Sequence, residues 1–283
     1  MTWLLGLILA LLDPALFGPG APGGRGVVIP LAPPSRDELG PLPPVTEARG
    51  DNPPLVVIDA GHGGRDPGAT SEFSSVPEKD ITLALALEMR DALAATGRVR
   101  VALTRADDTY LVLEDRYGIA RRLGADLFIS VHADISPSND QAHGATIYTL
   151  SEVASDREAA ALAQGQNAAD NLSGARFSPN PDVNLVLIDL AQRESMDASA
   201  EFARLLHREA APVFPFRPQW HRFAAFVVLK APDLPSILFE AGYLSNPTDA
   251  AFLQSPQGRA QIADGMRRAI EAHFAERFAV RRN

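Results

Sequence analysis

Hydrophobic and polar positions follow two alternating patterns along the chain from Leu55 onwards. Short apolar runs, typical of buried strands, are separated by longer segments in which apolar residues recur every three or four positions, as on one face of a helix. Strands are predicted at Leu55–Asp59, Val99–Thr104, Asp126–Val131, Ala145–Leu150, Ala224–Leu229 and Ser236–Glu240. Helices are predicted at Glu78–Ala95, Glu114–Leu123, Arg157–Asn171 and Pro256–Phe278. Because strands alternating with helices are typical of α/β proteins, we expect one α/β domain at 54–279, with a twisted, mostly parallel sheet of about six strands flanked by helices.

Residues 152–223 interrupt this alternation. They contain the predicted helix at Arg157–Asn171, a second helical stretch near Leu187–Ala211 and a Pro- and aromatic-rich segment that we interpret as a turn. The connection between neighbouring strands of an α/β domain is usually a helix with loops of about 2–6 residues. We therefore expect this region to contain a helical insertion.

The N-terminal region predicts export. Trp3–Leu12 is continuously apolar, too short to span a bilayer and typical of a signal-peptide core, although no Lys or Arg precedes it. We interpret residues 1–24 as a signal-peptide-like segment and the Pro- and Gly-rich residues 25–53 as a linker. No later segment is apolar enough to cross a membrane, so we expect a periplasmic protein with no stable membrane span after signal cleavage.

Composition narrows the possible partners and chemistry. The formal net charge of −9 and the isoelectric point of about 5.2 argue against nucleic acid, whose binding requires a basic face. The chain has no cysteine, which excludes disulfides, thiolate nucleophiles and Cys-ligated zinc. Any metal site must therefore use the six histidines and the carboxylates.

Three predicted strands end at or shortly before a residue that can bind metal or transfer protons. They are His62, His132 and Glu240, and Glu78 lies at the start of the helix that follows the His62 loop. Ligands of open α/β sheets bind beyond the carboxyl ends of the strands, so these residues are expected at one edge. Two histidines and a carboxylate form a zinc triad, and a second carboxylate serves as general base in amide or ester hydrolysis. These patterns leave open which glutamate binds the metal.

The glycines around His62, in the segment GHGG, allow two interpretations. They are either a phosphate cradle or the sharp turn and clearance that a large substrate needs to reach a metal. The spacing of nucleotide-binding loops is absent, and no G-K-[ST] occurs, which favours the second interpretation. Taken singly, each histidine fits a structural role and Glu78 fits a helix-start carboxylate; their joint occurrence favours a site. Arg65 and Asp66 receive no assignment.

Four segments carry a family resemblance in order along the chain: VVIDAGHGGRDPGA, EKDITLALALEMRDAL, ADLFISVHAD and LKAPDLPSILFEAGYLSNPTDA. They resemble the zinc-dependent N-acetylmuramoyl-L-alanine amidases, the family of bacterial cell-division amidases. The resemblance implies cleavage of the amide between N-acetylmuramic acid and the first L-alanine of the peptidoglycan stem peptide, in cell-wall remodelling and daughter-cell separation. It implies that His62, Glu78 and His132 bind Zn²⁺ and that Glu240 is the catalytic acid/base.

The resemblance extends to the insertion. Division-type members carry a helical segment here that lies over the zinc site and holds the free enzyme inactive until a degenerate LytM-domain activator displaces it. Leu162–Gly174 resembles the start of that segment. Some relatives add an inhibitory glutamate as a further zinc ligand; the matching residue here is Gln166, and Glu158 lies nearby. We expect a steric lid, with Gln166 and Glu158 as candidate inhibitory contacts.

Two alternative functions differ from a peptidoglycan amidase. One is a zinc peptidase or deacetylase acting on another amide, and the other is a wall-binding protein without catalysis. The segment FEAGYLSN argues against the first, and the presence of all four chemical residues argues against the second. Larger relatives also carry an N-terminal β-rich wall-binding domain, whereas this chain has about thirty Pro- and Gly-rich residues there.

Overall fold

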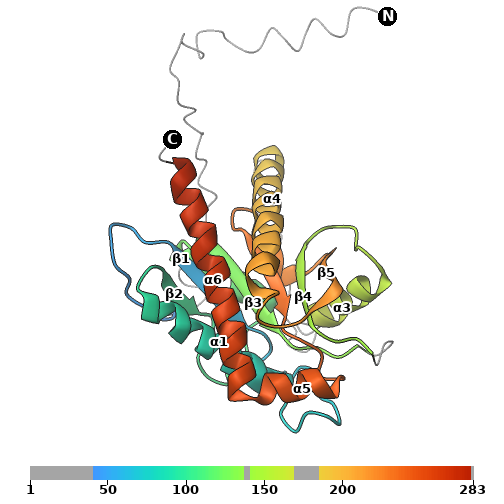
Figure 1. Cartoon of the computed structure of the whole chain (residues 1–283). Helices are drawn as coiled ribbons and strands as arrows, with labels where there is room; N and C mark the ends of the chain where they lie inside the picture. The colour runs from blue at the N-terminus through green and yellow to red at the C-terminus, as the bar shows by residue number, and fades with distance from the viewer. Residues whose placement is uncertain (1–40, 137–140, 169–184, 282–283) are drawn as a thin grey trace, which may run out of the picture. The chain divides into compact units, whose positions relative to one another are not determined.

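The computed structural model describes residues 41–136, 141–168 and 185–281, and the expected signal-peptide-like segment lies outside them. At the centre is a six-stranded sheet in the order β2-β1-β3-β6-β4-β5 (Figure 1). The strands are β1 (Leu55–Ala60), β2 (Arg100–Leu103), β3 (Leu127–His132), β4 (Ala145–Leu150), β5 (Phe216–Ala224) and β6 (Ser236–Glu240). All neighbours pair in parallel except β4 and β6. The prediction of a mostly parallel sheet of six strands is confirmed.

Helices cover both faces of the sheet because successive residues of each strand point to opposite sides. They are α1 (Glu78–Thr96), α2 (Leu113–Leu123), α3 (Arg157–Ala168), α4 (Leu185–Ala210), α5 (Pro247–Gln254) and α6 (Pro256–Arg281), with a 3-10 turn η3 (Val227–Leu229). Val56 and Ile58 of β1 pack into the core under α1, α4 and α6, where Figure 1 shows α6 between the other two helices. Leu55 and Val57 face the opposite core, formed with α2, α3 and η3.

Helix α1 has the features expected from its sequence. Its buried residues include Ile81, Leu85 and Met89, which lie one turn apart on one stripe. Gly97 ends the helix in the left-handed conformation, with φ of 63°. The start of this helix matters most, because it places Glu78 beside the loop after β1.

One strand prediction is wrong. The apolar residues Val227–Leu229 form the 3-10 turn η3, whereas the strand is Phe216–Ala224, which we had interpreted as a turn. The strand lies at the edge of the sheet and is half exposed, so its apolar positions do not form a continuous run, and Pro218 is tolerated there. Helix α5 was not predicted; the Asn246 side chain caps it by accepting two backbone N–H bonds.

Residues 152–223 contain α3, α4 and most of β5. Because α4 covers the main core and β5 belongs to the sheet, α3 is the described part of this region that lies apart from the main core. The predicted helix Arg157–Asn171 is described as far as Ala168. In the expected linker, Val45 forms an antiparallel bridge to Ala102 of β2.

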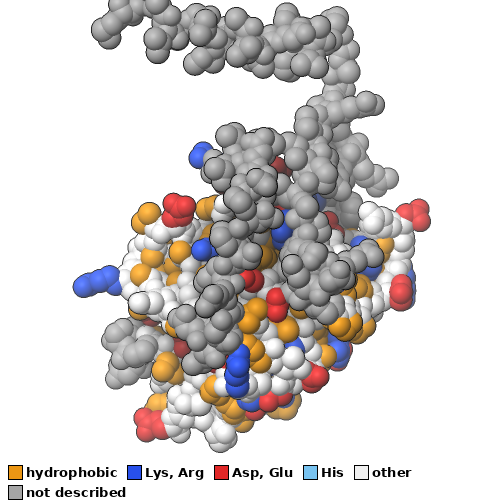
Figure 2. Space-filling view, turned by 180° about the vertical axis from the view of Figure 1, so that it is seen from behind, with side chains coloured by type: hydrophobic (Ala, Val, Ile, Leu, Met, Phe, Trp, Pro, Cys, Tyr) orange, Lys and Arg blue, Asp and Glu red, His pale blue; other side chains and the backbone are white. Residues whose placement is uncertain are grey.

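Two surface properties complete the description. Figure 2 shows acidic and basic side chains interspersed on the described part of one face. Among the described residues, no helix combines the length and the apolar character that crossing a membrane requires.

Candidate active site

The loop after β1 is folded so that three side chains can approach one another. A Cβ on Gly61 would lie 2.4 Å from Cε1 of the His132 ring. A Cβ on Gly68 would lie 2.7 Å from both Glu78 Oε2 and His62 Cδ2. His62 itself is in the left-handed region, with φ of 61°. Gly61 and Gly68 therefore provide clearance for the side chains of the site itself. From the sequence, the clearance was expected to serve the substrate.

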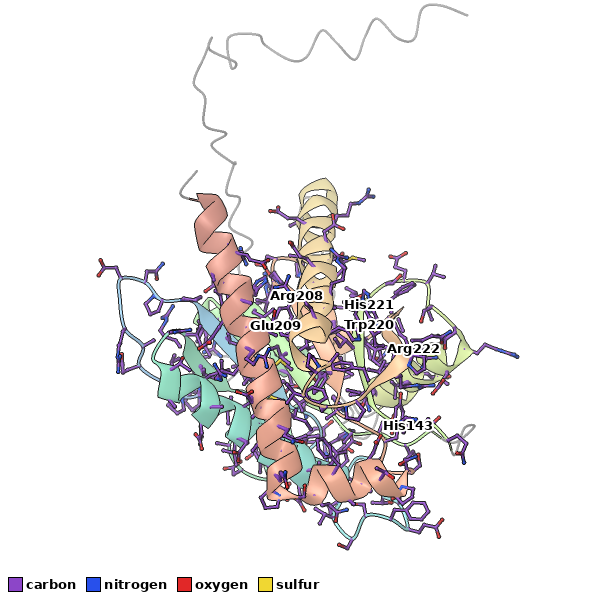
Figure 3. All side chains as sticks on the ribbon, in the orientation of Figure 1. His143, Arg208, Glu209, Trp220, His221 and Arg222 are labelled. Carbon is purple, nitrogen blue, oxygen red and sulfur yellow. The ribbon has the colours of Figure 1, made fainter. Side chains whose placement is uncertain are left out.

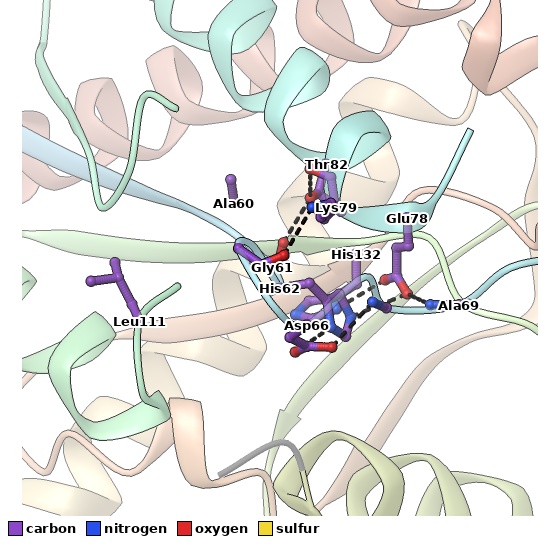
Figure 4. A network of polar contacts seen from close by, with 12 residues as sticks. Ala60, Gly61, His62, Asp66, Ala69, Glu78, Lys79, Thr82, Leu111 and His132 are labelled. Carbon is purple, nitrogen blue, oxygen red and sulfur yellow. Dashed lines mark hydrogen bonds and ion pairs between the residues drawn. The ribbon is translucent and has the colours of Figure 1, made fainter. Parts of the chain in front are cut away.

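His62, Glu78 and His132 form one buried cluster (Figure 4). Glu78 lies between the two histidines: its Oε2 is 3.1 Å from His62 Nε2, and its Oε1 is 3.1 Å from His132 Nδ1. One ligand atom from each of the three residues lies within 4.8 Å of the others. The structure thus brings together the three residues that the resemblance implied as metal ligands.

Asp66 orients the first histidine. The Nδ1–H of His62 donates to Asp66 Oδ2 at 2.8 Å, which turns Nε2 towards Glu78. Burial opposes ionisation of His62, but Glu78 and Asp66 raise its pKa to about 10. Asp66 has no assignment from the sequence alone. The feature that points to its role is its position four residues after His62, in a tight turn closed by hydrogen bonds between Gly63 and Asp66.

Backbone amides hold Glu78 in place. Its Oε2 accepts from the N–H of Ala69 at 2.8 Å, and its Oε1 accepts from the N–H of Ala133 at 2.9 Å. Burial opposes ionisation of this carboxyl, yet His62 and His132 bring its pKa well below the usual range. Glu78 is therefore a fixed carboxylate, as a metal ligand must be.

Glu240 lies beside the cluster on the neighbouring strand. It pairs in register with His132 across β3 and β6 and is fully buried. Its Oε2 accepts from the backbone N–H of Asp134 at 3.1 Å, while Oε1 has no hydrogen-bond partner among the described residues. Burial, with Asp134 and Glu78 nearby, raises the pKa of Glu240 well above its ordinary value. Burial likewise raises the pKa of Asp134, to about 7. Glu240 and Asp134 therefore have raised pKa values, whereas the pKa of Glu78 is lowered.

The buried ion pair between Arg116 and Asp59 helps to hold the loop after β1 in place. Arg116 of α2 donates to Asp59 Oδ1 at 2.9 Å and to the carbonyl oxygen of His62 at 2.8 Å. Asp59 also accepts from Thr104 and Ser130. Arg116 therefore ties the strained His62 backbone to the sheet. Sequence reasoning missed this contact, because 54 residues separate its two ends.

A cavity of about 950 Å³ opens onto the cluster. It is lined from the site loop, α1, the segment after β3 and α3, by residues that include His62, Asp66, Glu78, Asp134, Arg157, Glu158 and Gln166. Gln166 is buried at this wall. The carboxylate of Glu158 is hydrogen-bonded to Arg217, Arg222 and Ser136, and the cluster of metal-competent residues does not include it.

The cluster fits a metal ion on two observations. His62 Nε2 is buried and lies 3.1 Å from the Glu78 carboxylate, but it forms no well-directed hydrogen bond with any described residue, so this nitrogen is available to ligate a metal. The donor set of two imidazoles and one carboxylate is also that of zinc sites with an open fourth position. The fold and this cluster define an α/β protein with a His-Glu-His cluster that could hold a metal ion at the carboxyl ends of its strands.

The comparisons with known proteins identify the family within this class. A family model described as N-acetylmuramoyl-L-alanine amidase matches residues 56–272, most of the chain. The chain belongs to the N-acetylmuramoyl-L-alanine amidase family. The matched residues include every member of the cluster and Glu240.

Individual relatives support this membership. AmiC of Escherichia coli is 32% identical over 240 residues, which cover 84% of this chain and 57% of AmiC. AmiA of Salmonella typhimurium is 36% identical over 222 residues, covering 78% of this chain and 76% of AmiA. The chain thus spans little more than half the length of AmiC and about three quarters of AmiA.

Solved structures show the same fold. The catalytic domain of CwlV, an N-acetylmuramoyl-L-alanine amidase from Bacillus (Paenibacillus) polymyxa, superimposes with a TM-score of 0.59 and 28% identity, over 78% of this chain and 98% of that domain. AmiC2 of Nostoc punctiforme gives a TM-score of 0.57 at 24% identity, over 80% and 99% of the two chains, which shows the fold alone.

Proposed function

We propose that this protein is a zinc hydrolase that cleaves the amide between N-acetylmuramic acid and L-alanine of peptidoglycan. The observation that carries the proposal is the buried cluster of His62, Glu78 and His132, which lies within the segment matched by the amidase family. The relatives AmiC and AmiA are named N-acetylmuramoyl-L-alanine amidases. The cavity is large enough for a polymer segment to reach the cluster.

In this proposal His62, Glu78 and His132 hold the zinc ion. When bound, zinc polarises the scissile carbonyl and makes water more acidic. Asp66 keeps His62 Nε2 directed at the ion by accepting the Nδ1–H bond. The backbone amides of Ala69 and Ala133 keep the Glu78 carboxylate from turning away.

Glu240 is the proposed proton carrier. Its Oε1 is unpaired among the described residues and is free to take a proton from the attacking water. The water oxygen forms a bond to the lactyl carbonyl carbon, the carbon–nitrogen bond breaks, and Glu240 returns the proton to the alanine nitrogen. The products are a lactyl carboxylate and an amine. The raised pKa of Glu240 suits a group that must both accept and release a proton.

We also propose that the insertion restricts access to this site. Gln166 of α3 is buried at the wall of the cavity that contains His62. Because Glu158 is engaged by Arg217 and Arg222, restriction in this chain is steric and acts through Gln166. A degenerate LytM-domain activator is the proposed partner that relieves it, and the periplasm and daughter-cell separation are the proposed setting.

Purified sacculi test the proposal. The protein, incubated with and without a LytM-type activator, should release stem peptides that begin with L-alanine, and the activator should increase the rate. A chelator should abolish release, and added Zn²⁺ should restore it. Release of disaccharides, or of peptides cut internally, would show that the protein has a different activity. Loss of the protein from its bacterium should produce chains of unseparated cells.

A further inference from the structure

The acidic side chains that line the cavity all have a hydrogen-bond or ion-pair partner, including Asp134, which accepts from the backbone N–H of Ile135, whereas one basic side chain has none among the described residues. Asp66 pairs with His62, and Glu78 pairs with both histidines of the cluster. Glu158 pairs with two arginines. Arg157, the first residue of α3, also lines the cavity; it is exposed and has no hydrogen bond or ion pair to any described residue.

The carboxylate next to Arg157 cannot neutralise it, because that carboxylate already has stronger partners. Arg217 Nη1 donates to Glu158 Oε1 at 2.8 Å, and Arg222 Nη2 donates to Glu158 Oε2 at 3.0 Å. Both arginines come from β5, beside α3, where Figure 3 labels Arg222. Arg222 also binds Asp156, so two carboxylates balance two guanidinium groups. The positive charge of Arg157 is thus left over at the cavity.

The same contacts fix the position of Arg157. The bonds of Asp156 and Glu158 hold the start of α3 against β5. At the other end, the Asn167 side chain donates to the carbonyl oxygen of Ala225 and accepts from the N–H of Val227, each at 2.9 Å. Helix α3 is therefore held at both ends, so Arg157 projects from an anchored wall.

The substrate of the proposed function has negative charge on one side of the scissile bond. The sugars are neutral, and the lactyl carboxyl group is uncharged while it forms the amide. The remaining carboxylates belong to the stem peptide, at its acidic residues and its C-terminus. A guanidinium group binds a carboxylate with two parallel hydrogen bonds, which makes arginine suited to recognise it.

The geometry points to Arg157 as a substrate-binding residue that recognises a free carboxylate of the stem peptide and sets a preference for acidic over amidated peptides. This inference rests on the proposed function. Binding at this position is remote from the scissile bond, so it should act on KM and leave kcat nearly unchanged.

Two soluble substrates test the inference: N-acetylmuramoyl-L-alanyl-D-glutamate and the same compound with both peptide carboxyl groups amidated. The wild-type protein should have a kcat/KM about tenfold higher for the acid, the effect of one charge-assisted hydrogen-bonded pair. Arg157→Ala should reduce this ratio to near one by raising KM for the acid, with the amide substrate unaffected. Arg157→Lys should retain part of the preference, because it keeps the charge but loses the paired hydrogen bonds.

Arg98→Ala is the matched control, because it removes an equally charged side chain that pairs with Glu271 away from the cavity. It should keep the wild-type ratio. Equal cleavage of acid and amide by the wild type, or an unchanged ratio in Arg157→Ala, overturns the inference while leaving the amidase proposal intact. Failure to cleave either compound, and also sacculi, overturns the amidase proposal and the inference with it.

Discussion

Replacing Gly61 by alanine tests whether the absence of a side chain at this position is needed for the His132 ring to reach the proposed metal site. Gly61 does not have positive φ, so alanine brings no backbone strain and its effect comes from the methyl group alone. That methyl would lie 2.4, 2.5 and 2.8 Å from Cε1, Nε2 and Nδ1 of His132. An ordinary contact begins near 3.4 Å, so the imidazole must retreat by about 1 Å.

A displacement of this size is large for a ligand. Metal sites tolerate about 0.2 Å in ligand distance, and a misplacement of about 1 Å can reduce activity by about 10²-fold. The expected result for Gly61→Ala is a loss of zinc affinity and of amide cleavage by about that factor. Overpacking of the buried ring should also destabilise the metal-free protein by about 1–3 kcal/mol.

A double-mutant cycle with His132→Ala isolates the clash. In a chelator, urea denaturation gives the stability of the wild type, of Gly61→Ala, of His132→Ala and of the double variant. With the ring removed, the added methyl has space, so Gly61→Ala should then change stability by less than about 0.5 kcal/mol. An equal cost of Gly61→Ala in both backgrounds would refute the steric reasoning. Zinc affinity, measured by competition with a chromogenic chelator, should fall in the single variant Gly61→Ala.

Three further variants probe other parts of the site. Glu240→Gln should lower turnover by about 10²–10⁴-fold, as expected for loss of an acid/base group, while zinc affinity stays near wild type; an active variant would exclude the proposed role. Arg116→Leu leaves the buried Asp59 carboxylate without its cation and should reduce the free energy of unfolding by about 3–5 kcal/mol in urea titrations, with much of it recovered when Asp59→Leu is added. Although burial opposes it, the Arg222 hydrogen bonds lower the pKa of Asp156 from 3.8 to about 2, so its carboxylate stabilises the protein above pH 3.8 and this stabilisation is lost as the pH falls through 2. Asp156→Asn should therefore destabilise at pH 7, and its difference from wild type should shrink between pH 3.8 and 2 and disappear below pH 2; a pH-independent difference would contradict this.

The strand ends were predictable because their signal is local. The strands β1, β3 and β6 consist mostly of apolar residues, and each ends at or just before an ionisable group that is costly to bury unless it is paired or coordinated. Parallel topology then placed His62, His132 and Glu240 at one edge. The edge strand β5 was missed for the opposite reason: one face is in solvent, so its pattern is diluted by Arg217 and Gln219, which are partly or fully exposed.

The roles of the two glutamates depended on spatial relations that residue patterns do not contain. Glu78 lies between the histidines and is held ionised by them, whereas Glu240 lies one strand away with a raised pKa. The residues that tune the site were missed for the same reason. The backbone N–H of Asp134 donates to Glu240, and Arg116 donates to the carbonyl oxygen of His62, 54 residues away in the chain; both contacts depend on the folded structure.

The charges on α3 allow this helix to narrow the entrance to the site and still attract an acidic substrate. A carboxylate at the cavity wall would repel a stem peptide and compete with it for the metal. Here the wall carboxylate of Glu158 is neutralised by Arg217 and Arg222, which also anchor the helix. The group buried deeper along the helix is the neutral Gln166, and the group left charged is the cation Arg157. On the proposed function, the same helix therefore restricts entry by its bulk while its unpaired charge favours the acidic end of the substrate.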